Sequence, residues 1–270
     1  MTVENDLISI RYVREHGVHQ FRAANGMEVT GISEPTWEAF ETALDGLSQK
    51  TDGYIVTPEL MTSPVPLDQV AGIQATIEAR TEWVRDISSR YPWARILLGT
   101  ATFDRKEKLP RSSVLAFFGG EEIGRQHKIG GAQGEGKYFH YDWNIEKPDT
   151  ALDIDNQRLL ICSDMAEAAG AAIIASQPNF GHRQERADRI ISPTARTLIA
   201  ASCWVIPKSE REITASSRAI ENECQESLDG VTRTIFALYP RLRELIMVDR
   251  AIPELGTRPF NAHFKRLSIN

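Results

Sequence analysis

Apolar residues recur at helical spacing in two stretches of the N-terminal half. The first follows Ser33, a residue type that caps helices, and its apolar positions are Trp37, Phe40, Leu44 and Leu47. The second runs from about Val70 to Ile87 and is broken at Tyr91-Pro92, because a proline disfavours helical conformation in the residue before it. The pattern therefore predicts a short helix followed by a longer one.

Short apolar runs between and after these helices predict strands. They cover residues 54–57, 95–101, 113–118, 122–125, 152–154, 158–162 and 189–193. Gly119-Gly120 and Asp155-Asn156 are typical of hairpin turns. Residues 197–206 fit either a strand or a buried helix, and an Ala-rich helix is expected to begin after Asp164. Because strands and helices alternate, with hairpins inserted, the sequence predicts an α/β architecture with a mixed sheet.

Composition narrows the possible classes of protein. The 270 residues are 41% hydrophobic and contain neither internal repeats nor a linker, so we expect a single domain over residues 1–270. The net charge of -6 argues against binding to nucleic acid. No apolar stretch is long enough to cross a membrane and no secretion signal is evident, so we expect a cytoplasmic protein.

Three polar residues follow apolar strands at the point where each predicted strand ends. Glu59 follows YIVTP, Lys128 follows the second hairpin strand, and Cys162 ends the run RLLIC. Sites in layered α/β folds are built at strand ends. A thiol, a carboxylate that removes its proton and an ammonium that stabilises an oxyanion together meet the needs of acyl transfer through a thioester.

The motifs around these three residues resemble those of the carbon–nitrogen hydrolase (nitrilase) superfamily. They read DGYIVTPEL, IGRQHKIG and LLICSD, and the resemblance extends over about residues 50 to 200. The intervals also look like those of the family: 128 − 59 = 69 residues from Glu59 to Lys128 and 162 − 128 = 34 residues from Lys128 to Cys162. The C-terminal 50 or so residues are atypical, and Ser163 replaces the aromatic residue that usually follows the cysteine.

This resemblance implies a fold, an assembly and a set of roles. The fold would be a four-layer α-β-β-α sandwich that pairs into an αββα-αββα homodimer or a larger homo-oligomer. Glu59 would be the general base and Cys162 the nucleophile, whereas Lys128 and the backbone N–H of Ser163 would hold the oxyanion. Glu135 would support the site, and no cofactor or metal is implied.

Aromatic residues between the lysine and cysteine motifs, and after the cysteine, are candidates for the substrate pocket. We expect Tyr138, Trp143 and Phe180 to contact a small-molecule substrate, although aromatic packing beneath a long loop is an equally good interpretation. Residues 131–138 nearly match a phosphate-binding loop, but Tyr138 replaces its hydroxyl residue. The histidines lack the spacing of a metal site.

The sequence thus predicts a cysteine-dependent hydrolase of a small amide or nitrile. Two alternatives remain open. An acyl-enzyme could instead pass its acyl group to an amine, which would make the protein a transferase. The altered residues after Cys162 also allow a catalytically silent interaction module.

Overall fold

The computed structural model describes part of the chain, in fourteen helices and strands. The described residues are 18–22, 28–32, 37–47, 49, 53–63, 67–130, 135–141, 153–154, 157–161, 164, 188, 190–201, 239, 241–242 and 244–248. The N-terminal elements are β1 (Val18–Arg22), β2 (Glu28–Ile32), α1 (Trp37–Gly46), β3 (Gly53–Val56), the 3-10 helix η1 (Leu67–Ile73), α2 (Gln74–Arg90) and β4 (Ala94–Thr102). The later ones are β5 (Arg111–Phe118), β6 (Glu121–His127), the 3-10 helix η2 (Glu135–Lys137), β7 (Asp153–Ile154), β8 (Gln157–Ile161), β9 (Thr197–Ala201) and β10 (Glu244–Val248).

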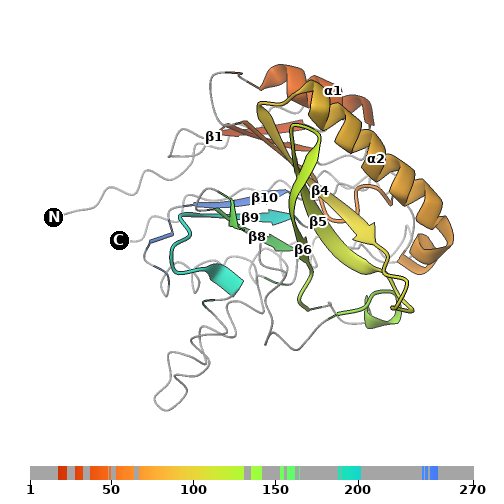
Figure 1. Ribbon diagram of the computed structural model, residues 1–270. Coiled ribbons are helices and arrows are strands. Elements are labelled where there is room, and N and C mark those ends of the chain that lie inside the picture. Colours follow the sequence, from red (N-terminus) through yellow and green to blue (C-terminus); the bar gives the residue numbers. More distant parts are fainter. Residues whose placement is uncertain are drawn as a thin grey trace, which may run out of the picture.

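The strands form two mixed sheets. The larger sheet has the order β1-β2-β3-β4-β5-β6, in which β2, β3 and β4 are mutually parallel and the remaining neighbours are antiparallel. The smaller sheet has the order β10-β9-β8-β7, and only β7 runs antiparallel to its neighbour. Figure 1 shows the smaller sheet beside the larger one, with α1 and α2 across the far side of the larger sheet. The α/β class with mixed sheets is confirmed.

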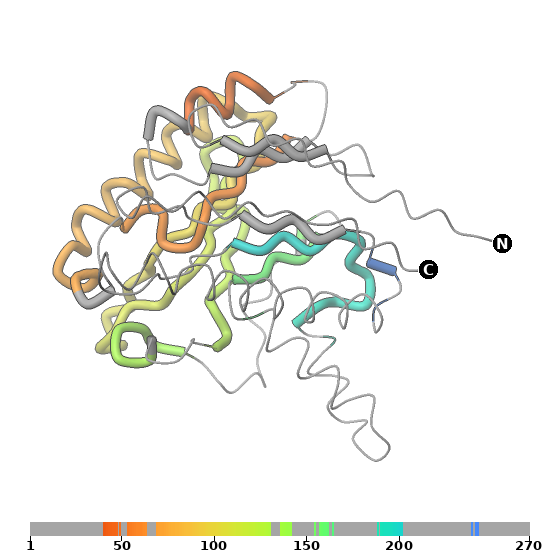
Figure 2. The backbone as a smooth tube through the Cα atoms, turned by 180° about the vertical axis from the view of Figure 1, so that it is seen from behind, coloured from red at the N-terminus to blue at the C-terminus, as the bar shows by residue number. Residues whose placement is uncertain are grey.

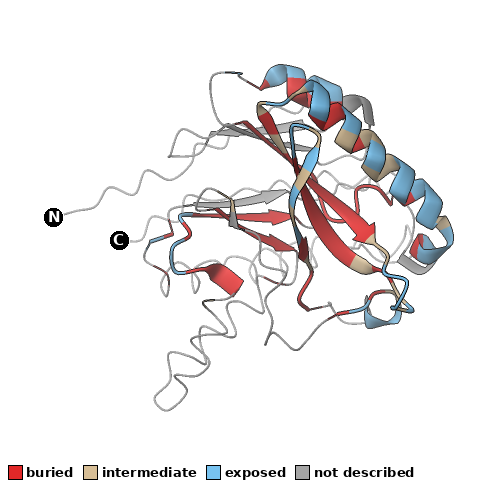
Figure 3. Cartoon of the chain, in the orientation of Figure 1, coloured by how far each residue is buried: buried red, intermediate tan, exposed pale blue. Residues whose placement is uncertain are grey.

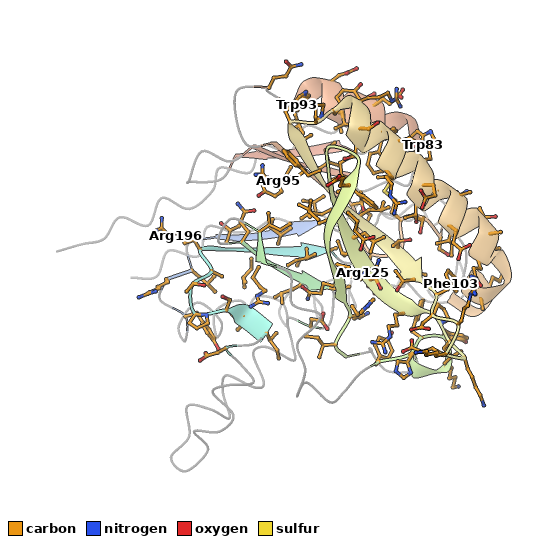
Figure 4. The ribbon with its side chains drawn as sticks, in the orientation of Figure 1. Trp83, Trp93, Arg95, Phe103, Arg125 and Arg196 are labelled. Carbon is orange, nitrogen blue, oxygen red and sulfur yellow. The ribbon has the colours of Figure 1, made fainter. Side chains whose placement is uncertain are left out.

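Alternation along the strands builds two separate apolar layers. Tyr54 and Val56 of β3 pack with Leu159 and Ile161 of β8. This packing joins the two sheets. Ile55, between them in sequence, faces the opposite way and packs with residues of α1 and α2. Trp83 of α2, labelled in Figure 4, meets Phe40 of α1 edge to face, with ring centroids 6.0 Å apart. In the described part of the chain the layers therefore run helix, sheet, sheet.

Burial follows this layering. Figure 3 shows β4, β5, β8 and β9 as mostly buried, while the outward faces of α1 and α2 are exposed. The backbone traced from behind in Figure 2 shows the same order of layers. The Ala-rich helix expected after Asp164 lies outside the described residues, and the fourth layer of the sandwich stays a prediction. The dimer pairing stays a prediction.

Most predicted elements of the central region are confirmed. The structure has both helices, the strands near 54, 95, 113 and 122, and the hairpin that ends in β8. Residues 197–201 form a strand, which decides between the two interpretations of that run. The predicted strand at 189–193 is wrong, because Ile190 and Ile191 lie in a helical turn in which Ser192 donates its backbone N–H to the Asp188 carbonyl. Two adjacent buried isoleucines fit a short strand and a helical turn equally well.

Candidate active site

The loop after β3 holds Glu59 against the neighbouring strand β4. Thr57 donates its backbone N–H to the Leu97 carbonyl over 2.9 Å, and its Oγ1 accepts from the N–H of Gly99 over 2.7 Å. The chain therefore continues along β4 after β3 ends at Val56. It then turns at Leu60, which has a φ of 56°, in the left-handed region. This turn leaves Glu59 buried, with 2% of its surface exposed.

Lys128 reaches the same point from the end of β6. Its backbone N–H donates to the Ser112 carbonyl over 2.8 Å, which prolongs the β5–β6 ladder by one residue. Its Nζ lies 3.0 Å from Oε1 and 3.4 Å from Oε2 of Glu59, 69 residues away in the sequence. The Lys128 side chain is fully buried. Burying an ion pair costs desolvation of both charges, so the pair requires close geometry and further hydrogen bonds.

Ser112 of β5 supplies one of those further hydrogen bonds. Its Oγ donates to Oε1 of Glu59 over 2.5 Å, so this oxygen accepts from both Ser112 and Lys128. Ser112 lies on the same face of β5 as Val114 and Ala116, which pack in the layer between the two sheets. The ion pair therefore lies on the side of the larger sheet that faces β8.

Asp164 joins the segment after Lys128 to the end of β8. Its Oδ1 accepts from the backbone N–H groups of Ile129, over 2.8 Å, and Gly130, over 3.2 Å. Its Oδ2 accepts from the N–H of Ile161 over 3.3 Å. The side chain is completely buried, and burial raises its pKa to about 7 against the opposing effects of the two loop hydrogen bonds and of Lys128.

His127, although next to Lys128 in sequence, lies on the other face of the sheet. Its Nδ1 is 2.7 Å from Oγ of Ser113, which neighbours Ser112 on β5 and so points the opposite way. His127 borders a cavity of about 500 Å³ whose wall includes Phe103 and Arg125 (Figure 4). Burial and the charges of Arg111 and Arg125 lower the pKa of His127 to about 4.

The other candidate residues fall into two groups. Cys162, Ser163, Trp143 and Phe180 lie outside the described residues. Glu135 begins η2, but its side chain is also outside the described part. The sequence places Cys162 directly after Ile161, the last residue of β8 and a hydrogen-bond partner of Asp164.

Tyr138 packs against an apolar cluster whose buried members include Leu60, Phe139 and Tyr141. Leu60 is the residue directly after Glu59. Phe139 and Tyr141 lie with their rings tilted at 50° to each other. Aromatic packing beneath the loop is thus observed for these two residues, while Tyr138 remains partly exposed at the edge of the cluster.

The sequence does not predict the contacts that Ser112 and Asp164 make. Ser112 stands two positions before Val114 and four before Ala116, so the alternation of a strand places this polar residue on the same face as the two apolar ones. That pattern is a signal by which Ser112 could be found. In the sequence Asp164 marks only the start of the expected Ala-rich helix, and no sequence signal indicates that its partners include Ile129 and Gly130.

No group of three or more His, Cys, Asp or Glu side chains among the described residues is arranged to hold a metal ion. None of the helices in that same part of the chain combines the length and hydrophobicity needed to span a membrane.

Comparison with known proteins gives structural matches only. No protein-family model matches the sequence, and no curated protein matches it. An amidase from Nesterenkonia sp. is similar in structure, with a TM-score of 0.47 and 16% identity over 69% of this chain and 65% of the amidase, just under two thirds of its length. A Saccharomyces cerevisiae member of branch 10 of the nitrilase superfamily gives 0.45 and 16% over 79% of this chain and 67% of that one. Glutamine-dependent NAD+ synthetase from Acinetobacter baumannii gives 0.45 and 15% over 68% of this chain and 32% of the synthetase.

Proposed function

We propose that this chain is a divergent carbon–nitrogen hydrolase that cleaves a small amide or nitrile through a thioester on Cys162. The observation that carries the proposal is the buried Glu59–Lys128 ion pair on the side of the larger sheet that faces β8, the strand directly before Cys162. A solvent-excluded carboxylate and ammonium, held together across 69 residues of sequence, supply a proton acceptor and a positive charge beside one strand end.

Each residue has a defined part in the reaction of an amide. Glu59 takes the thiol proton of Cys162, and the thiolate sulfur forms a bond to the carbonyl carbon, whose π electrons move to oxygen. The Lys128 ammonium and the backbone N–H of Ser163 stabilise that oxyanion. A lysine has three N–H donors and can bind Glu59 and an oxyanion together. The C–N bond then breaks, and the leaving amine takes the proton from Glu59.

A second half-reaction restores the enzyme. Glu59 removes a proton from water, whose oxygen attacks the thioester carbon while Lys128 again stabilises the oxyanion. The C–S bond breaks, the acid is released and the sulfur recovers its proton. Ser112 keeps Oε1 of Glu59 in one orientation through both steps, because that oxygen accepts from Ser112 as well as from Lys128.

The substrate is small and contacts aromatic side chains, on this proposal. The partly exposed Tyr138, at the edge of the cluster that contains Leu60, supports an apolar wall close to Glu59. Trp143 and Phe180 complete that wall, and Glu135 orients the site from the loop after Lys128. We further propose a cytoplasmic homodimer, which sedimentation velocity tests: a 30 kDa particle alone at micromolar concentration would contradict the dimer.

Intact-mass spectrometry tests the reaction. The wild type and Cys162→Ala are incubated with a panel of small amides and nitriles, and ammonia release is followed in parallel. We expect an acyl adduct and turnover in the wild type, and neither in Cys162→Ala. Cys203→Ala, which removes another of the three cysteines at positions 162, 203 and 224, is the matched control and should retain both.

Two results would contradict the proposal. Turnover that survives Cys162→Ala would exclude the thioester. A folded wild type that gives no adduct, and whose three cysteines react equally slowly with iodoacetamide, would indicate the silent interaction module.

A further inference from the structure

The Asp164 carboxylate connects segments that belong to different sheets. Ile129 and Gly130 follow β6 of the larger sheet, whereas Ile161 is the last residue of β8 in the smaller one. One oxygen accepts from the first segment and the other from the second. The segment that begins with Lys128 and the strand that ends before Cys162 are therefore tied through a single side chain.

A carboxylate has the hydrogen-bond acceptors that this link requires, whereas the side-chain amide of an asparagine does not. An ionised carboxylate is an acceptor at both oxygens, so it can accept N–H groups from two directions at once. An asparagine has one acceptor oxygen, and its amide NH₂ would face a backbone N–H on one of the two sides. The carboxylate is completely buried, where it costs desolvation, and its bonds with the backbone offset part of that cost.

We propose that Asp164 is a positioning residue that sets the separation between the Lys128 ammonium and Cys162 by holding Ile129 and Gly130 to the end of β8. The inference rests on the proposed function, because that function gives the separation its importance. Asp164 acts through the backbone on either side of the reacting groups and makes no contact with substrate.

Protonation of Asp164 changes the link. The charged groups that act on its carboxylate are Lys128, which follows β6, and Glu59, which follows β3. When the carboxyl group takes up a proton, one of its oxygens becomes an O–H donor and can no longer accept from the N–H that faces it. The link then holds one segment less firmly, and the pKa of about 7 places this change close to neutral pH.

The experiment compares wild type with Asp164→Asn at pH values from 5.5 to 8.5. The rate of Cys162 alkylation by iodoacetamide is read by peptide mass spectrometry, and hydrolysis of an amide accepted by the wild type gives kcat and KM. We expect Asp164→Asn to lower kcat by about 100-fold with KM little changed, the loss typical of a small displacement of reacting groups. We also expect the wild-type alkylation profile to contain a transition near pH 7 that Asp164→Asn lacks.

Ser88→Ala is the matched control for a merely structural effect. Ser88 is also completely buried, and its Oγ accepts from the N–H of Gly120 at the β5–β6 turn. We expect this variant to lose thermal stability while it keeps both the wild-type pH profile and kcat. An Asp164→Asn variant that behaves in the same way, with the transition near pH 7 intact, would overturn the proposal.

Hydrogen exchange of the wild type provides a test that needs no variant. We expect the Ile129, Gly130 and Ile161 amides to be protected to a similar degree, because one carboxylate accepts from all three. Protection of Ile161 alone, with Ile129 and Gly130 exchanging freely, would overturn the link. A failure of the proposed function is distinguishable, because it would appear as turnover that survives Cys162→Ala or as a wild type without turnover, whatever the exchange of these three amides shows.

Discussion

Gly99 of β4 and Pro58 of the loop after β3 are in backbone contact: a Cβ atom built on Gly99 would lie 2.0 Å from the Pro58 carbonyl oxygen. The same atom would lie 2.9 Å from Cα of Glu59. Because these neighbours are backbone atoms, they cannot rotate away as the end of a side chain can. The absence of a side chain at Gly99 is thus what lets the loop press Glu59 against β4 and keep it buried.

We expect Gly99→Ala to displace Glu59 and to lower the free energy of unfolding by about 1–3 kcal/mol or more, as overpacking does. The rate of hydrolysis should fall to the background rate, because the Glu59 carboxylate would move away from Lys128. Gly72→Ala is the matched control, since a Cβ there would meet no atom within 4 Å. Urea unfolding and an activity assay on both variants check this. Equal stability of the two variants would contradict the steric argument.

The ion pair predicts a different pattern of stability. Lys128→Met leaves the Glu59 carboxylate buried without its ammonium, and loss of one partner of a buried pair costs about 3–5 kcal/mol. The double variant Glu59→Gln/Lys128→Met should recover most of the lost free energy of unfolding, because no uncompensated charge remains. Neither variant should hydrolyse substrate. Urea unfolding of the double variant and of each single variant, Lys128→Met and Glu59→Gln, checks this. If the double variant loses as much free energy of unfolding as the two single variants lose in sum, the two charges do not interact.

The positions of Glu59 and Lys128 at strand ends, and the resemblance of the surrounding motifs to the nitrilase superfamily, pointed to these two residues in the sequence, and the structure brings the two side chains together. β3, before Glu59, was predictable because its apolar run ends at Pro58. β6, before Lys128, was predictable because Gly119-Gly120 marks a hairpin turn after the apolar run 113–118. The role of Cys162 stays a prediction, since that residue lies outside the described part of the chain.

Other features depend on tertiary contacts that carry no local signal. Ser112 meets Glu59 across 53 residues, and Asp164 meets Ile129 across 35. β1 and β2 were not predicted, because VHQFR and EVTGI mix polar and apolar residues without a continuous apolar run. Pairing with each other and with β3 places them in the larger sheet.

Ser112 and Ser113 allow a test of which face of β5 carries the chemistry. Ser112→Ala removes a hydrogen bond to a buried carboxylate, which is worth about 1.5–3 kcal/mol. We expect kcat/KM to fall by roughly 10- to 100-fold, because about 1.4 kcal/mol corresponds to a factor of ten. Ser113→Ala removes hydrogen bonds that do not involve Glu59, with His127, Thr102 and the Arg111 carbonyl. It should keep its activity within about twofold, and equal losses in steady-state assays of the two variants would place the chemistry elsewhere.

His127 predicts a loss of stability in mild acid. Its pKa in the folded protein is about 4, lowered by burial and by Arg111 and Arg125 from an ordinary value of 6.5. Between these two values the unfolded chain binds more protons at this residue than the folded chain does. The contribution of His127 to stability is therefore complete above pH 6.5 and declines as the pH falls toward 4.

The variant His127→Asn isolates this contribution, because asparagine can still bond to Ser113 but does not titrate. Asp164 acts in the opposite direction, since its pKa is raised from 3.8 to about 7 and its protonation on acidification favours the folded state. The effect of Asp164 is the same in the wild type and in His127→Asn, so it cancels when their free energies of unfolding are subtracted. Urea unfolding at pH 7.5, 6.0 and 4.5 should show the wild type losing stability relative to His127→Asn as the pH falls. A constant difference across the three pH values would mean that His127 is protonated equally in the folded and unfolded chains.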